Sequence, residues 1–231
     1  MKKIICFMTL LIGFASFVTH ADEIMLEDFE DGDEGQPYPD WEKVLAKYEV
    51  PKHTIEPGGA NGTAKAYQLI DDSAQGQWFG KHFDDVSGEI YTDFYCKNVE
   101  KTTSLWMAVR QGETNGFYIE LDEQDAQPIN FGSSIGKIAV MNEYSADTWY
   151  HIQVQYDTTK GKASVWINDK EVVNSEDCDK LDFVNSIGFG TGGSFTGTLW
   201  IDEVYVGTMP KPVSVDNADN RLPTTWGSLK R

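Results

Sequence analysis

Positive charge is scarce in this chain of 231 residues. It contains 19 lysines and arginines against 37 aspartates and glutamates, which gives a formal net charge of −18 at pH 7. Nucleic-acid phosphates are bound by clustered basic side chains, so this balance argues against a DNA- or RNA-binding protein. It argues equally against electrostatic docking to anionic membranes.

Long apolar runs are absent after the first residues. Ile4 to Val18 is a mostly apolar run that follows two lysines and precedes a Thr19-His20-Ala21 sequence. This arrangement predicts a signal peptide over residues 1–21, and an uncleaved anchor is the alternative. The run is shorter than the roughly 20 residues of a membrane-spanning helix. We therefore expect an exported protein, secreted, periplasmic or at the cell surface, with no stable membrane insertion after cleavage.

Cysteine is also rare, and the common catalytic motifs are absent. Cys6 lies in the apolar run, and the remainder of the chain contains only Cys96 and Cys178. Neither has the companions of a zinc site or of a nucleophile motif. Export permits a disulfide between them, and two separate buried thiols are the alternative. No G-x-S-x-G, P-loop, zinc-protease or dinucleotide-binding motif occurs.

Alternation of apolar and polar residues is what the sequence does contain, and it is typical of half-buried strands. Some expected strands show this alternation, and others are short segments flanked by turns. They are 24–29, 63–70, 77–83, 89–96, 104–111, 117–122, 137–142, 148–156, 162–168, 171–173, 185–189 and 198–206. Many short strands with frequent turns predict an all-β fold, an antiparallel two-sheet β-sandwich over residues 22–207. Asp40 to Tyr48 is expected to form a short helix. Residues 208–231 lose the alternation and are expected to form a linker and a short tail.

Four segments resemble the concanavalin A-like lectin and glucanase superfamily, and laminin-G-like jelly rolls of secreted bacterial proteins in particular. They are the opening 26–32, the hairpin strands 147–154 and 161–168, and the closing strand 200–206. The resemblance implies a jelly-roll sandwich over nearly the whole mature chain. Galactose-binding-like jelly rolls share the opening and closing strands and are the nearest alternative.

The same resemblance implies one structural calcium ion. Its carboxylate ligands would be Glu30 in the opening segment and Asp202 in the closing strand, aided by carbonyl groups near Gly59 to Thr63. Calcium prefers six to eight oxygen ligands, roughly, which this set could begin to supply. An acidic, solvated edge without an ion is the alternative.

The polar sides of several strands combine aromatic rings, amides and charges. If these strands are neighbours, the side chains form one surface that suits sugars, because rings stack on pyranose C–H faces and polar groups hold hydroxyls. In this class glycans usually lie on the concave sheet. The candidate carbohydrate-binding residues are Tyr91, Tyr95, Trp106, Arg110, Tyr118, Glu120, His151 and Gln153. Aromatic side chains packed under loops are the alternative.

Catalysis is a second hypothesis. The glucanase branch carries an E-x-D-x-x-E strand, and here Glu120 and Asp122 match while Asp125 replaces the last glutamate. A lyase would need His151, Tyr118 and Arg110 to lie together. We expect a carbohydrate-binding module without cofactor chemistry and assign no catalytic residue. The alternatives are a polysaccharide hydrolase or lyase, and a protein-binding adhesion or structural module; the sequence leaves the oligomeric state open.

Overall fold

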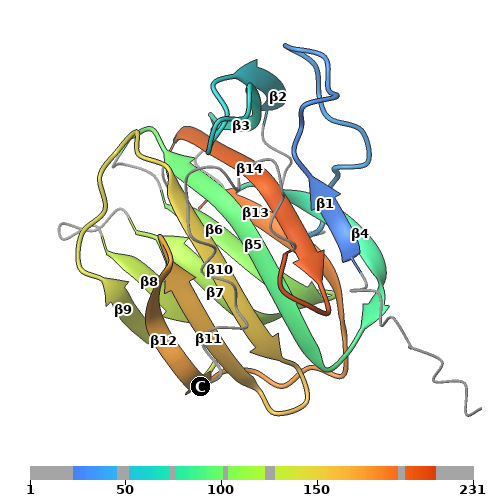
Figure 1. The fold of residues 1–231 in the computed structure, drawn as a ribbon, viewed down its shortest axis with the longest axis vertical. Coiled ribbons are helices and arrows are strands. Elements are labelled where there is room, and N and C mark those ends of the chain that lie inside the picture. The colour runs from blue at the N-terminus through green and yellow to red at the C-terminus, as the bar shows by residue number, and fades with distance from the viewer. Residues whose placement is uncertain are drawn as a thin grey trace, which may run out of the picture.

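The computed structural model describes residues 23–45, 52–72, 76–100, 104–122, 128–191 and 196–211. These residues form fourteen strands and contain no helix (Figure 1). The predicted signal peptide and the residues after Lys211 lie outside the described part. Within that part, no helix is long and apolar enough to cross a membrane.

The larger sheet, sheet A, has the strand order β12-β11-β10-β5-β14-β3-β2, and β1 also pairs with β14. Every pairing in it is antiparallel. Its strands are β1 (Glu23–Glu27), β2 (Lys52–Pro57), β3 (Lys65–Asp71), β5 (Glu89–Asn98), β10 (Tyr150–Asp157), β11 (Lys162–Ile167), β12 (Lys170–Asp177) and β14 (Gly197–Gly207).

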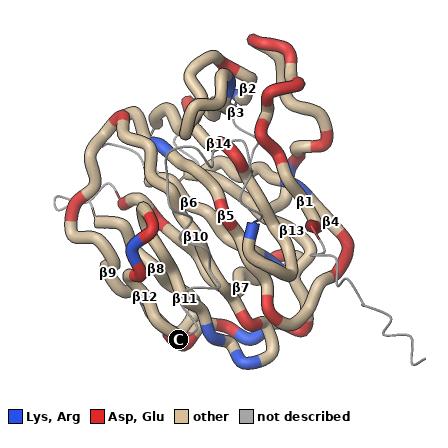
Figure 2. The backbone as a smooth tube through the Cα atoms, in the orientation of Figure 1, with Lys and Arg blue, Asp and Glu red and all other residues tan. Residues whose placement is uncertain are grey.

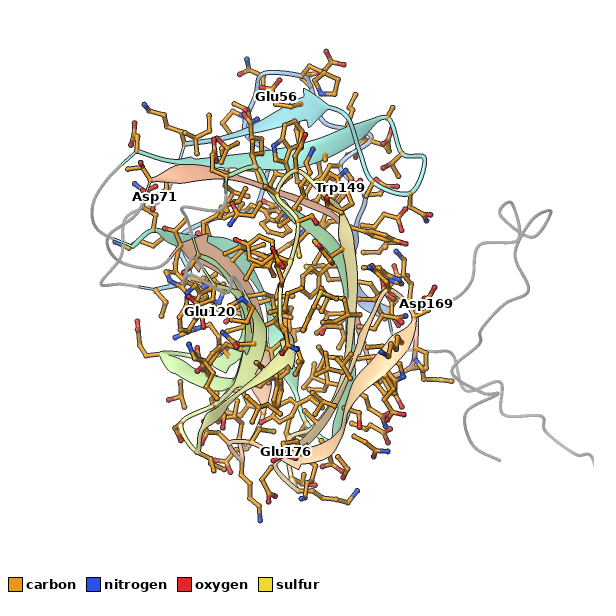
Figure 3. The ribbon with its side chains drawn as sticks, turned by 90° about the vertical axis from the view of Figure 1, so that its left-hand side faces the viewer. Glu56, Asp71, Glu120, Trp149, Asp169 and Glu176 are labelled. Carbon is orange, nitrogen blue, oxygen red and sulfur yellow. The ribbon has the colours of Figure 1, made fainter. Side chains whose placement is uncertain are left out.

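The second sheet, sheet B, has the order β4-β13-β6-β7-β8-β9 and is also antiparallel throughout. Its strands are β4 (Trp78–Val86), β6 (Leu105–Gln111), β7 (Thr114–Leu121), β8 (Ile129–Gly132), β9 (Lys137–Met141) and β13 (Val184–Thr191). The two sheets lie face to face (Figure 3). The all-β, two-sheet sandwich predicted from alternation is therefore confirmed.

The core lies between the sheets and follows the predicted period of two. In β10 of sheet A, Ile152 and Val154 are buried in the core, whereas His151 and Gln153, which alternate with them along the strand, are not part of it. In β7 of sheet B, Phe117, Ile119 and Leu121 point into the same core. Each strand therefore turns its other side chains to the outside of the sandwich, where a binding surface can form.

The short helix predicted over Asp40 to Tyr48 is wrong for its described part, because residues 40–45 are not helical. Glu42 instead forms an isolated bridge with Gly80 of β4, with a 2.8 Å hydrogen bond in each direction. Trp41 inserts its ring among the core aromatics, 5.1 Å from the ring of Phe79. Pairing and burial thus outweigh local helix propensity here. Residues 46–48 lie outside the described part.

Charge is distributed unevenly over the backbone (Figure 2). Acidic residues gather in the segment that follows β1, which contains Asp28, Glu30, Asp31, Asp33 and Glu34. This segment lies outside the core strands, so its charges remain at the edge of the molecule. The excess of negative charge is therefore a property of loops as well as of the sheet faces.

Candidate functional site

The eight candidate carbohydrate-binding residues divide equally between the two sheets. Sheet A carries Tyr91 and Tyr95 on β5, and His151 and Gln153 on β10. Sheet B carries Trp106 and Arg110 on β6, and Tyr118 and Glu120 on β7. Figure 3 shows Glu120 on one side of the sandwich and Asp169, from the turn after β11, on the other. The expectation of one shared surface is therefore wrong. Alternation distinguishes the inner from the outer face of a strand, but it does not reveal to which sheet the strand belongs.

On the outer face of sheet A, the polar side chains bond to one another. The buried carboxylate of Asp93 lies 3.0 Å from His151 Nε2 and accepts a hydrogen bond of 2.8 Å from the Gln153 amide. The ring of Tyr95 stacks on His151 with a centroid distance of 4.4 Å and an interplanar angle of 6°. This network fixes Tyr95, His151 and Gln153 in place through contacts within the protein.

His151 is the titratable centre of this network. Its Nδ1 atom lies 3.4 Å from a carboxylate oxygen of Asp169. Burial lowers the pKa of His151, but the hydrogen bond to Asp93 and the charges of Asp93 and Asp169 outweigh burial and the opposing charge of Lys211. The net pKa of His151 is therefore raised.

On the outer face of sheet B, three aromatic rings lie in a row. The rings of Trp78 and Trp106 have centroids 6.5 Å apart, and those of Trp106 and Tyr118 are 4.6 Å apart. Glycines allow the outer rings to lie close against the sheet: a Cβ atom at Gly190 would come within 2.6 Å of the Trp78 indole, and one at Gly132 within 2.4 Å of Tyr118. Trp106 and Tyr118 remain partly exposed.

Beside this row lies a cluster of two carboxylates, an amide and an ammonium group. Lys137 Nζ lies 3.1 Å from Glu120 Oε2 and 3.0 Å from Asp122 Oδ2. The Asn130 amide donates to the same two oxygens, at 3.4 and 3.0 Å. Because both carboxylate oxygens lie about 3 Å from one ammonium nitrogen, they are at most about 6 Å apart.

Burial sets the electrostatics of this cluster. Both carboxylates are buried, whereas the Lys137 side chain is 38% exposed. Burial and the charge of Asp122 raise the pKa of Glu120 more than Lys137 and Asn130 lower it. Burial lowers the pKa of Lys137, but its two carboxylate partners outweigh this and raise the net value.

Arg110 lies on the same face, but its guanidinium group bonds to acceptors within the protein. Its Nε atom donates to the Gly112 carbonyl at 3.2 Å, one terminal nitrogen donates to the Glu113 carbonyl at 2.6 Å, and the other donates to the Asn115 side chain. Its guanidinium carbon lies 5.7 Å from the centre of the Trp78 ring. Arg110 is only 2% exposed, so it holds the β6–β7 turn and the end of the aromatic row.

Three residues of the sheet B site were missed from the sequence. Trp78 and Lys137 were visible as the second and the first residues of expected strands, but nothing indicated that these strands lie in the same sheet as β6 and β7, with one strand between each pair. Asn130 belongs to β8, which was not expected as a strand. Pairing partners across a sheet depend on topology, and a single sequence does not carry that information.

The two carboxylates expected to bind calcium both contact the loop between β2 and β3. Glu30 Oε1 accepts hydrogen bonds from the backbone N–H groups of Ala64 and Lys65, at 2.7 and 2.9 Å. Asp202 Oδ2 accepts from the Ala60 N–H at 2.7 Å and from the Thr63 hydroxyl at 2.6 Å. The opening segment and the closing strand are therefore both tied to this loop, through its N–H and hydroxyl donors.

The chemistry of this loop fits a calcium ion only in part. Lys65 Nζ donates to the carbonyls of Glu30 and Gly32, at 3.0 and 2.8 Å, so an ammonium group occupies two carbonyl oxygens there. Burial is the main cause that raises the pKa of Asp202 to about 6. Within the described residues, no three Asp, Glu, His or Cys side chains group as metal ligands. The calcium ion stays a prediction.

Both described cysteines are free thiols, so the structure does not contain the Cys96–Cys178 disulfide. Cys96 lies in β5 with its side chain in the core. Cys178 follows β12, where its backbone N–H donates to the Gly161 carbonyl at 2.9 Å. Each is buried in a different part of the sheet, and burial raises the pKa of both thiols, to about 12 for Cys178.

Comparison with known proteins shows likeness in fold but not in sequence. No protein-family model and no curated protein sequence matches the chain. A sialidase superposes with a TM-score of 0.61 at 14% identity, and the match covers 82% of this chain and 19% of the sialidase. Domain 4 of AbnA, a GH43 extracellular arabinanase from Geobacillus stearothermophilus solved in complex with arabinotriose, superposes with a TM-score of 0.50 at 17% identity, covering 81% and 92%. These likenesses show the β-sandwich fold.

Proposed function

We propose that this protein is an exported carbohydrate-binding β-sandwich, and that it binds a polysaccharide on the outer face of sheet B. The observation that carries the proposal is the row of Trp106 and Tyr118 lying directly beside Glu120, Asp122 and their partners. Aromatic rings stack on the C–H faces of sugars, while carboxylates, amides and ammonium groups bond hydroxyls. Such a platform with a polar end gives a sugar both a position and an orientation.

The outer face of sheet A is less suited to a ligand. Asp93, His151 and Gln153 bond to one another, and Tyr91 donates to Glu89, so a sugar would have to displace existing hydrogen bonds. The fold comparison adds support of a general kind, because the arabinanase domain of similar fold is described in complex with arabinotriose.

The test is titration of the purified protein with a panel of soluble polysaccharides, followed by calorimetry and by size-exclusion elution. Trp106→Ala removes one ring and should weaken binding at least about fivefold, since stacking on one aromatic ring contributes about 1–3 kcal/mol where it has been measured for nucleobases. Gln153→Ala, on sheet A, is the matched control and should leave the affinity within about twofold. Equal loss in both variants, or unchanged binding in Trp106→Ala, would contradict the proposed surface.

A glycoside hydrolase is the second candidate, and one observation favours it. One oxygen of Glu120 and one of Asp122 lie at most about 6 Å apart, a limit that admits the roughly 5–5.5 Å between the carboxyl groups of retaining glycosidases, and burial raises the pKa of Glu120, as a general acid requires. A fall in polymer mass with new reducing ends would identify this activity. Glu120→Gln should then abolish turnover while binding persists. Polymer that stays intact after long incubation would contradict hydrolase activity and favour a module that only binds.

A calcium ion at Glu30 and Asp202 is proposed here as a structural addition to the fold. The support is that both carboxylates converge on the β2–β3 loop. Addition of calcium to chelator-treated protein should raise the melting temperature, and Glu30→Gln should remove the effect. An identical melting temperature with calcium and with chelator would mean that the hydrogen bonds of the loop hold this edge without an ion.

A further inference from the structure

We infer that the glycan bound on sheet B is neutral, and that polymers of uronate or sulfated sugars are excluded. The inference rests on the proposed function and adds the charge class of the ligand. It follows from how the charged side chains on this face are already paired.

The basic residues available to an anionic sugar are few. The strands of sheet B, which are β4, β6, β7, β8, β9 and β13, contain only Lys81, Arg110 and Lys137 as lysines or arginines. Lys81 is paired with Glu27 of β1 in sheet A. Arg110 is nearly fully buried and directs its nitrogens to the Gly112 and Glu113 carbonyls and to Asn115. Its guanidinium group is therefore committed to the β6–β7 turn.

Lys137 is also paired within the protein, and it has two acidic partners. One ammonium group lies within 3.1 Å of both Glu120 and Asp122, so a single positively charged group faces two carboxyl groups. A ligand carboxylate placed at Lys137 would come close to two buried carboxylates. Like charges in a poorly solvated place repel strongly, because little water is present to screen them.

Hydroxyl groups meet no such penalty. A hydroxyl can donate to a carboxylate oxygen and accept from the amide of Asn130 or the exposed side of Lys137. Two neighbouring hydroxyls of one sugar ring would match the two adjacent carboxylates, while the apolar face of the ring or of its neighbour lies on Tyr118 or Trp106. A neutral polysaccharide offers this combination along its whole length.

The first experiment compares matched neutral and acidic polymers, at low salt of about 0.05 M and at high salt of about 0.5 M. Arabinan, xylan, mannan and β-glucans form the neutral set, and polygalacturonate, alginate and a sulfated galactan form the acidic set. We expect binding within the neutral set only, with an affinity that changes less than about twofold between the two salt concentrations.

Binding of an acidic polymer that weakens with salt and is lost in Lys137→Gln would overturn the inference and leave the proposed function intact. Binding of neither set would overturn the proposed function itself. The two failures are therefore distinguishable.

The second experiment changes the charge of the site. The double variant E120Q/D122N keeps the shape and removes two negative charges, so Lys137 becomes unbalanced. We expect neutral-glycan affinity to fall at least about tenfold and acidic polymers to gain measurable, salt-sensitive binding. Asp157→Asn, at the end of β10 in sheet A, removes a charge far from the site and should change neither affinity. Acidic polymers that still fail to bind a folded E120Q/D122N protein would show that charge does not set the selectivity.

Discussion

Single glycines determine how the aromatic rings lie on sheet B. Gly132→Val should tilt Tyr118 away from the sheet, because even a Cβ atom at this position would meet the Tyr118 ring at 2.4 Å. Overpacking of this kind costs about 1–3 kcal/mol of stability. We expect a lower free energy of unfolding in urea and, for folded protein, glycan affinity reduced at least about fivefold.

Gly136 provides the control for this substitution, since a Cβ atom there has no heavy atom within 4 Å. Gly136→Ala should leave both stability and affinity close to wild type. Full glycan affinity in a folded Gly132→Val protein would show that the position of Tyr118 is irrelevant to binding.

The state of the two described cysteines is a second property of individual residues. Burial raises the pKa of both thiols, so neither should react with iodoacetamide in the native protein at pH 7.5. In denaturant without reductant, Cys96 and Cys178 should both become alkylated, which peptide mass spectrometry detects. Recovery of a linked peptide pair instead would show that the protein forms the disulfide.

At the scale of elements, Asp202 connects the closing strand β14 to the β2–β3 loop. It accepts three hydrogen bonds, from the Ala60 N–H, the Thr63 hydroxyl and the Glu203 N–H, at 2.6–2.7 Å. Asp202→Ala would leave the buried Ala60 N–H and the partly buried Glu203 N–H without this acceptor, at a cost of about 1–3 kcal/mol each, whereas the Thr63 hydroxyl could still donate to the Ala60 carbonyl. We expect the free energy of unfolding to fall by about 3 kcal/mol in urea titrations.

Asp28→Ala removes an exposed carboxylate near the same edge and serves as the comparison, with an expected change within about 0.5 kcal/mol. Equal stability of the Asp202→Ala and Asp28→Ala proteins would mean that the loop and β14 are held together by packing alone.

The elements also show what the sequence could and could not predict. Alternation correctly assigned Phe117, Ile119 and Leu121 to the core, because burial on one face imposes the period of two. It missed β8, whose alternation of Ile129 and Phe131 in the core with Asn130 on the outer face extends over only four residues, too few to stand out in the sequence. It also joined residues of β5 and β6 into one surface, although these consecutive strands belong to opposite sheets. The chemistry of the site was visible in single residues, but its assembly depended on strand order.

For the whole molecule, sheet A should make stability depend on pH through His151. The histidine is faced by Asp93 and Tyr95 from β5, by Asp169 from the β11–β12 turn, and by Lys211 after β14. Because the net pKa of His151 is raised in the folded protein, its contribution to stability is fully present below the unfolded value of about 6.5. It is lost as the pH rises through the folded pKa.

Urea midpoints measured between about pH 5.5 and pH 8.5 should therefore decrease with rising pH. In His151→Gln this decrease should become smaller, whereas His82→Gln, at an exposed position of β4, should keep the wild-type slope. Glycan affinity on sheet B should stay unchanged in His151→Gln, since the network and the site lie on opposite faces of the sandwich. A wild-type slope in His151→Gln would show that the histidine network does not couple protonation to folding, and a loss of glycan affinity would place the ligand on sheet A.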